Sequence, residues 1–383
     1  MLTLLASAHT RRAYWVALGT CVLTVGLNQQ ILSAQAASGT NGPSVDTVFR
    51  NIRVLKGLPA ELLNPTMVFF EAALGVGCEH CHTADPDRRD LDVKPQKMMA
   101  RRMIEMVTAL NKSTFGGTNK VTCFTCHMGR AIPMRVPIVT GAELPPALGS
   151  DYVANQPPPP AVPAIDPREV LDRFFAASGG GAGVQKSPSL VAAGTVTQRR
   201  PGRQVPAQQV EISSKAPGME LIATRVGPAT NVVAYGADHA WAKAGEMAPR
   251  DLRKAEGDAT KLEDAFNIPA QLKQMLVDPK MERPEVIDGR EVYVVGGRTQ
   301  YLPQVMAYFT KENGMLRRLV YYIDTPFGQY PTQIEYSAFQ DVGGRTVPYS
   351  WVISQTRNRE YTWAMQSVRA VAVEDSKFTR PLK

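Results

Sequence analysis

Apolar residues in the first third of the chain recur at helical spacing in two segments. In residues 66–74 they fall on one face of a helix, which Asn64-Pro65 can start. A longer helix is predicted over residues 95–110, because its apolar positions recur at intervals of four, three and four residues. These positions are occupied by Met99, Met103, Met106 and Leu110. Residues 38–135 are therefore predicted to form a mainly α-helical domain.

The pattern changes twice after this region. Prolines are concentrated in residues 136–165, which predicts an extended linker. Asp166-Pro167 then starts a helix, and most of the remaining chain alternates apolar and polar residues as antiparallel strands do, with polar helical segments at residues 249–276. Hairpin turns are predicted at Asp288-Gly289, Asn313-Gly314 and Gly343-Gly344. The chain is thus predicted to be multidomain, with an antiparallel β domain containing helices at residues 166–383.

Residues 1–36 are predicted to be a secretory signal peptide. Arg11 and Arg12 precede an apolar run of about fifteen residues, too short for a membrane span, and Ala34-Gln35-Ala36 offers a small-x-small cleavage site. Cys21 lies in the apolar run, where lipidation is the alternative, but Thr20 suits a lipoprotein signal poorly. Cys21 is therefore predicted to leave with the signal. The mature protein is expected to be periplasmic or otherwise exported, and soluble or peripheral to a membrane.

Composition and charge exclude some classes of function. With 44% hydrophobic and 20% charged residues, the chain is predicted to be globular. The net charge of +8 is not accompanied by interleaved aromatic and basic residues, so no nucleic acid partner is predicted. Residues 85–92 contain four aspartates but lack the glycine and terminal glutamate of an EF-hand, and arginines neutralise them, so a solvated turn is predicted.

Two short motifs provide the chemistry of the helical region. Both have the form Cys-x-x-Cys-His, the attachment signature of haem c: Cys78, Cys81 and His82 in the first, and Cys123, Cys126 and His127 in the second. Two thiols at this spacing can bond the two vinyl groups of one porphyrin, and the adjacent imidazole can ligate the iron as proximal ligand. A zinc site would require the two pairs to converge on one ion, and a thioredoxin-like pair would require a βαβ pattern, which is absent. Two covalently attached haem c groups are predicted.

The sixth ligand of each iron needs a separate donor. Besides the two proximal imidazoles, only His80 and His239 remain in the predicted mature chain. A methionine thioether is then the natural donor, and the methionines of the two predicted helices are candidates. Packing in the core is the alternative role for such a methionine stripe.

The same stretches resemble two haem-binding segments of the photosynthetic reaction centre cytochrome c subunit family. The matching strings are Thr66-Met67 ahead of residues 77–82, the run Ala100-Arg101-Arg102-Met103-Ile104-Glu105-Met106, and Val121-Thr122-Cys123-Phe124-Thr125-Cys126-His127. In that family a helix supplies a distal methionine to the haem attached just downstream. The resemblance therefore implies Met67 as distal ligand for the haem of His82, and Met103 for the haem of His127, with Met106 and Met99 as alternatives at the second site. The family subunit has four attachment sites, so neither a four-haem relay nor docking to a photosynthetic reaction centre is implied.

The predicted β domain resembles the half-barrel of bacterial lipoprotein-carrier (outer-membrane lipoprotein-sorting) proteins. The resemblance lies in a helix followed by a long strand meander and in short strings such as Asp341-Val342-Gly343-Gly344-Arg345-Thr346-Val347-Pro348-Tyr349. It implies an antiparallel β half-barrel with a cleft for an apolar ligand or a lipoprotein. Residues 166–383 show no nucleophile–base pair and no phosphate-binding loop, and His239 is predicted to be structural or exposed.

If both irons have two axial protein ligands, neither offers an open position to a substrate. The leading hypothesis is therefore an electron carrier rather than an enzyme, with redox partner proteins, membrane-bound ones included, as donor and acceptor. A diheme peroxidase or oxidase with one open haem site is the first alternative. A haem-based redox sensor coupled to lipid or lipoprotein binding is the second.

Overall fold

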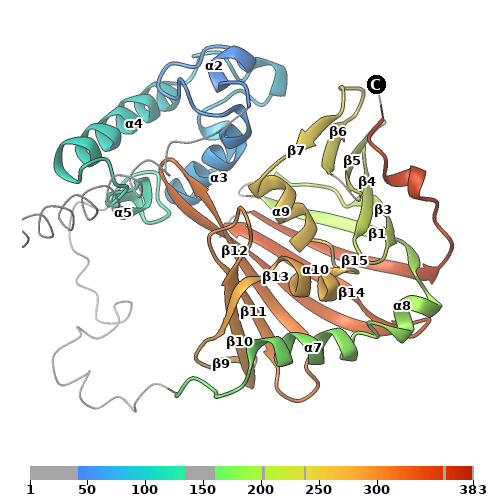
Figure 1. Ribbon diagram of the computed structural model, residues 1–383. Coiled ribbons are helices and arrows are strands. Elements are labelled where there is room, and N and C mark those ends of the chain that lie inside the picture. The colour runs from blue at the N-terminus through green and yellow to red at the C-terminus, as the bar shows by residue number, and fades with distance from the viewer. Residues whose placement is uncertain (1–41, 134–159, 201–202, 237–238, 357–358, 382–383) are drawn as a thin grey trace, which may run out of the picture.

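A computed structural model of the chain describes residues 42–133, 160–200, 203–236, 239–356 and 359–381 (Figure 1). The predicted signal peptide at residues 1–36, with Cys21, lies outside the described residues, and so does most of the predicted linker. Among the residues described, no helix is both long enough and apolar enough to cross a membrane.

The N-terminal region contains the helices that the periodicity predicts. α3 (Leu63–Leu74) ends at Gly75, whose φ of 64° is left-handed, and the longer α4 (Pro95–Thr114) begins with its proline in the first turn. The other elements are short: α2 (Val45–Val48), η1 (Ala60–Leu62), η2 (Cys78–His80), η3 (Pro86–Arg88) and α5 (Cys123–His127). Long turns separate these elements, so α-helix occupies less than half of residues 42–133. Helices are present, but the region is not clearly mainly α-helical.

The rest of the chain forms one large antiparallel sheet with helices, as predicted. The strand order is β7-β6-β5-β4-β3-β1-β15-β14-β13-β12-β11-β10-β8, with β2 paired to β1 and β9 paired to β10. The strands are β1 (Ser189–Arg200), β2 (Arg203–Gln204), β3 (Gln208–Lys215), β4 (Met219–Val226), β5 (Ala229–Tyr235), β6 (Ala240–Ala244), β7 (Arg250–Leu252), β8 (Val277–Met281), β9 (Glu285–Ile287), β10 (Arg290–Arg298), β11 (Val305–Thr310), β12 (Leu316–Thr325), β13 (Gly328–Val342), β14 (Arg345–Thr356) and β15 (Arg359–Ala370). The three predicted turns join β9 to β10, β11 to β12 and β13 to β14. Each turn contains a glycine at positive φ, which hairpin turns of this kind require.

Helices cover one face of the sheet, which curves around them (Figure 1). They are α7 (Pro167–Ala177), α8 (Ala182–Lys186), α9 (Ala255–Leu262) and α10 (Ile268–Met275), and η4 (Asp375–Phe378) follows the last strand. Aromatic contacts join the two layers: Phe174 of α7 meets Phe309 of β11 at 5.3 Å between ring centroids, and Phe266 meets Trp351 of β14 at 6.1 Å. The helix predicted to start at Asp166-Pro167 therefore packs against the sheet, with Val170, Leu171 and Phe174 buried.

The N-terminal region packs against the β12–β13 end of the sheet. Phe70 of α3 lies 5.3 Å from Phe327 between ring centroids, and Asn119 donates a 2.7 Å hydrogen bond to the carbonyl of Pro326. Val68, Phe69 and Ala73 of α3 belong to the same buried cluster as the sheet's core. Burial of these apolar side chains holds α3 at this place.

Candidate haem-binding site

Both Cys-x-x-Cys-His motifs open onto one cavity of about 1270 Å³. Common small-molecule sites measure about 300–1,000 Å³, so this cavity has room for an unusually large ligand. Of the predicted site residues, those that line it are Met67, Cys78, Cys81, His82, Met103, Cys123 and His127. Cys126 is exposed and does not line the cavity. Of the eight residues predicted to attach or ligate the two haems, the fold thus places seven around this cavity.

The first motif follows directly from the end of α3. Its turn is closed by a 2.9 Å hydrogen bond from the backbone N–H of His82 to the carbonyl of Cys78. The thiol of Cys78 donates to the carboxylate of Glu71 at 2.6 Å. Burial, reinforced by Glu71, raises the pKa of Cys78, and burial also raises the pKa of Cys81.

The second motif is helical. α5 begins with a capping box, in which Thr125 accepts a 3.0 Å hydrogen bond from the backbone N–H of Thr122. Burial raises the pKa of Cys123 to about 11. Thioredoxin-like cysteines need a lowered pKa, and the raised pKa values of Cys78, Cys81 and Cys123 run against that role. In the described part of the chain, no three His, Cys, Asp or Glu side chains are grouped as a metal ion requires.

The two candidate proximal histidines are oriented in the same way. Nδ1 of His82 lies 2.8 Å from the carbonyl oxygen of Arg89, and Nδ1 of His127 lies 2.9 Å from that of Arg130. A carbonyl only accepts, so Nδ1 donates its proton and Nε2 of the neutral ring is left as a metal-binding lone pair. Burial lowers the pKa of His82, which favours this neutral form. The donor set of each motif, two thiols and an oriented imidazole, fits haem c.

The two motifs are held close together by a glycine pair. Gly129, just after the second motif, donates a 3.0 Å hydrogen bond from its N–H to the carbonyl of Ala73 near the end of α3. A Cβ added to Gly75 would overlap the carbonyl oxygen of Gly129. Only glycine at this position permits the approach of the second motif to α3.

The methionines differ in their surroundings. Met67 of α3 and Met103 of α4 are half-buried and line the cavity, as does Met99, which is 51% exposed. Met106 is exposed and does not line the cavity. The buried face of α4 consists of Lys97, Ile104, Val107 and Asn111. The methionine stripe is therefore not the core face of α4, and Met99 and Met106 do not serve as core packing. The assignments of Met67 and Met103 as axial ligands stay predictions.

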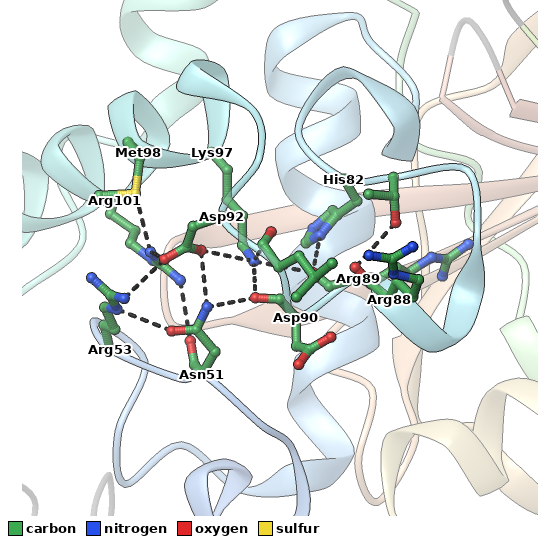
Figure 2. A network of polar contacts seen from close by, with 12 residues as sticks. Asn51, Arg53, His82, Arg88, Arg89, Asp90, Asp92, Lys97, Met98 and Arg101 are labelled. Atoms are coloured by element: carbon green, nitrogen blue, oxygen red, sulfur yellow. Dashed lines mark hydrogen bonds and ion pairs between the residues drawn. The ribbon is translucent and has the colours of Figure 1, made fainter.

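A polar network beside His82 was not foreseen in the sequence (Figure 2). Asp92 forms ion pairs with Arg53 at 2.9 Å, Lys97 at 3.1 Å and Arg101 at 2.8 Å. The hydrogen bond from Arg101 is the main reason that the pKa of Asp92 lies well below its usual range. The prediction of a solvated turn for residues 85–92 was wrong for Asp92, because three cations from other segments enclose its carboxylate.

Residues of the β domain also line the cavity, and sequence reasoning missed them. They are Arg250, Asp251, Arg253, Glu256 and Arg359. Arg359 pairs with Glu71 of α3 at 3.3 Å and so reaches the first motif from β15. No local pattern marks these residues, since they come from two strands, a loop and helix α9, all far along the chain. His239, the remaining histidine of this half, is exposed.

Comparison with known proteins identifies relatives of the N-terminal half. The family model described as photosynthetic reaction centre cytochrome C subunit matches residues 21–214. The photosynthetic reaction center cytochrome c subunit of Thermochromatium tepidum is 36% identical over 116 residues, which is 29% of this chain and 28% of that protein. The corresponding subunit of Rubrivivax gelatinosus is 34% identical over 112 residues, or 28% of this chain and 30% of that protein. The chain thus spans less than a third of the length of these relatives.

Solved structures similar to the β domain are distant. A LolA superfamily protein, NE2245 from Nitrosomonas europaea, has a TM-score of 0.42 and 12% identity, covering 56% of this chain and 98% of that chain. An outer membrane lipoprotein-sorting protein domain from Vibrio parahaemolyticus has a TM-score of 0.43 and 9% identity, covering 56% and 97%. The description of the β domain therefore rests on its own strand order.

Proposed function

The chain belongs to the photosynthetic reaction centre cytochrome C subunit family, and on that premise we propose that it is an exported diheme c-type cytochrome that transfers electrons. One observation supports this most strongly. Two Cys-x-x-Cys-His motifs share one cavity, and each histidine is held through Nδ1 by a backbone carbonyl. A histidine whose Nδ1–H is held by a carbonyl presents Nε2 to a metal, and the same arrangement in both motifs supports an iron-binding role for each.

The residues that would hold the two groups follow from the motifs. Cys78, Cys81 and His82 would hold one haem, with Met67 as distal ligand; Cys123, Cys126 and His127 would hold the other, with Met103 as distal ligand. When bound, each haem supplies a one-electron couple. The chain itself would orient the imidazoles, exclude water from the cavity and set the local charge.

Basic side chains outnumber acidic ones around the cavity. Its lining includes eight Lys and Arg residues against six Asp and Glu residues. Guanidinium groups suit carboxylates such as the propionates of a porphyrin, which they can bind through two parallel hydrogen bonds. We propose that the arginines lining the cavity bind the propionates through N–H groups that are not already used in pairs within the protein. Arg359 is one of these arginines and belongs to the β domain.

The β domain has a structural part in this proposal. Arg250, Arg253 and Arg359 close the cavity from its side, and the contact of Phe70 with Phe327 fixes α3. Docking of redox partners, or of an apolar ligand or lipoprotein, remains a proposal for this domain. The pocket between α7 and the sheet measures about 10 Å³, about the space of one water.

Carbon monoxide distinguishes the electron carrier from the diheme peroxidase or oxidase. The reduced holoprotein is expected to bind none, because Met67 and Met103 would fill the sixth position at both irons. A redox titration should show two one-electron steps. The visible spectrum before and after exposure to carbon monoxide measures this. Stoichiometric binding at either haem of the unmodified protein would favour the enzyme instead.

A further inference from the structure

One backbone carbonyl receives two donors beside the first motif. The carbonyl oxygen of Arg89 lies 2.8 Å from Nδ1 of His82 and 3.0 Å from Nζ of Lys97. Figure 2 shows the two side chains converging on this residue from different elements, His82 from the motif and Lys97 from α4. A carbonyl oxygen has two lone pairs, so both bonds can exist at once.

Lys97 occupies a costly position. It is only 9% exposed, and it stands in the first turn of α4, where the helix dipole disfavours a cation. Its Nζ is compensated by the carbonyls of Arg89 at 3.0 Å, Asp90 at 2.7 Å and Leu91 at 2.9 Å. The carboxylate of Asp92 lies 3.1 Å away. An ammonium bound to three successive carbonyls fixes the path of the segment that orients His82.

The shared carbonyl has an electronic consequence. A hydrogen bond from Nδ1–H to a good acceptor makes an imidazole a stronger electron donor to its metal. The carbonyl of Arg89 is a weaker acceptor for His82 because its electron density is also drawn toward the ammonium of Lys97. A nearby positive charge further favours whichever redox state carries less positive charge. Both effects act in the same direction, toward the reduced state.

We propose that Lys97 is a positioning residue for His82 and, by sharing the Arg89 carbonyl with it, raises the reduction potential of the haem at the first motif. This inference rests on the proposed function, since it requires a haem attached at Cys78 and Cys81. The negative charge of Asp92 lowers the potential that Lys97 raises. Arg53 and Arg101 weaken this lowering because they pair with the same carboxylate.

The test uses the full-length holoprotein with Lys97→Met, which keeps an apolar stem and removes the ammonium. Spectroelectrochemical titration should show that the midpoint potential of one haem falls by about 30–60 mV. For one electron this is about a three- to tenfold change in the equilibrium constant toward the oxidised state. The other couple should not move. Lys97→Arg should restore most of the potential, because a charged donor returns.

Two further variants keep the proposal open to contradiction. Lys112→Met removes a charge from an exposed site on the same helix and should move neither couple. Asp92→Asn removes the opposing anion and should shift the same couple toward reduction. The proposal is overturned if both potentials are unchanged in Lys97→Met, or if Lys112→Met shifts a potential by as much as Lys97→Met does. If Lys97→Met loses its haem, the absence of a shift in Asp92→Asn overturns it. Failure of the proposed function itself would appear differently, as fewer than two covalent haems in the unmodified protein.

Discussion

Replacing Met67 by alanine should lower the midpoint potential of the haem at the first motif and open its iron to carbon monoxide. A thioether ligand stabilises the reduced iron, so its loss should shift the couple by more than tenfold in equilibrium constant, or more than about 59 mV. Met103→Ala should do the same at the second haem only. The measurements are a redox titration and the near-infrared methionine–ferric absorbance, part of which each change should remove.

Met106→Ala is the matched control for these variants. Met106 lies one helical turn beyond Met103 but is 50% exposed and does not line the cavity, so its removal should leave both couples in place. Loss of the band from Met99→Ala instead of Met103→Ala would move the second assignment to Met99, which does line the cavity. An intact band in Met67→Ala would refute the first assignment.

Gly75→Ala should disrupt the packing of the second motif against α3. The residue has a φ of 64°, which costs a non-glycine residue about 1–2 kcal/mol, and its new Cβ would overlap the rigid backbone of Gly129. Relief requires the two backbones to separate and breaks the 3.0 Å bond from Gly129 to Ala73. We expect a total loss of about 2–5 kcal/mol and reduced haem attachment at the second motif. Thermal denaturation and intact mass measure the two effects.

Gly116→Ala provides the comparison. Gly116 has nearly the same φ, 60°, but nothing lies within 4 Å of an added Cβ. It should therefore show the backbone strain alone, about 1–2 kcal/mol, with full haem attachment. Equal destabilisation by the two substitutions would mean that the contact between Gly75 and Gly129 does not hold the motifs together.

Local sequence patterns predicted local structure well here. The two Cys-x-x-Cys-His motifs are contiguous, so no knowledge of the fold is needed to find them. The turns at Asp288-Gly289 and Gly343-Gly344 were equally predictable, because such pairs tolerate positive φ where a hairpin requires it. The helices α3 and α4 were placed by periodicity, although the later end of α4, at Thr114, extends beyond the apolar stripe.

Relations between distant segments were not predictable. Arg359 pairs with Glu71 although most of the sequence separates them, and no spacing rule connects the two. In the sequence Asp92 is one charge in a predicted solvated turn, yet Arg53, Lys97 and Arg101 pair with it. They do so because the loop containing Arg53 and the start of α4 lie beside it. The spacing of apolar residues also indicates the methionines as the apolar face of α4. In the structure, the buried apolar residues of α4 are Ile104 and Val107. A pattern shows that a stripe exists but not what it faces.

The central claim is that this chain holds two haems by thioether bonds, each with an imidazole and a methionine on its iron. Intact mass of the denatured, purified protein, read together with its iron content and the spin state of the native form, tests it most directly. The account predicts the mass of the mature polypeptide plus two haems, two irons and a low-spin spectrum. A mass showing one haem or none, or a high-spin iron in the resting protein, would contradict it.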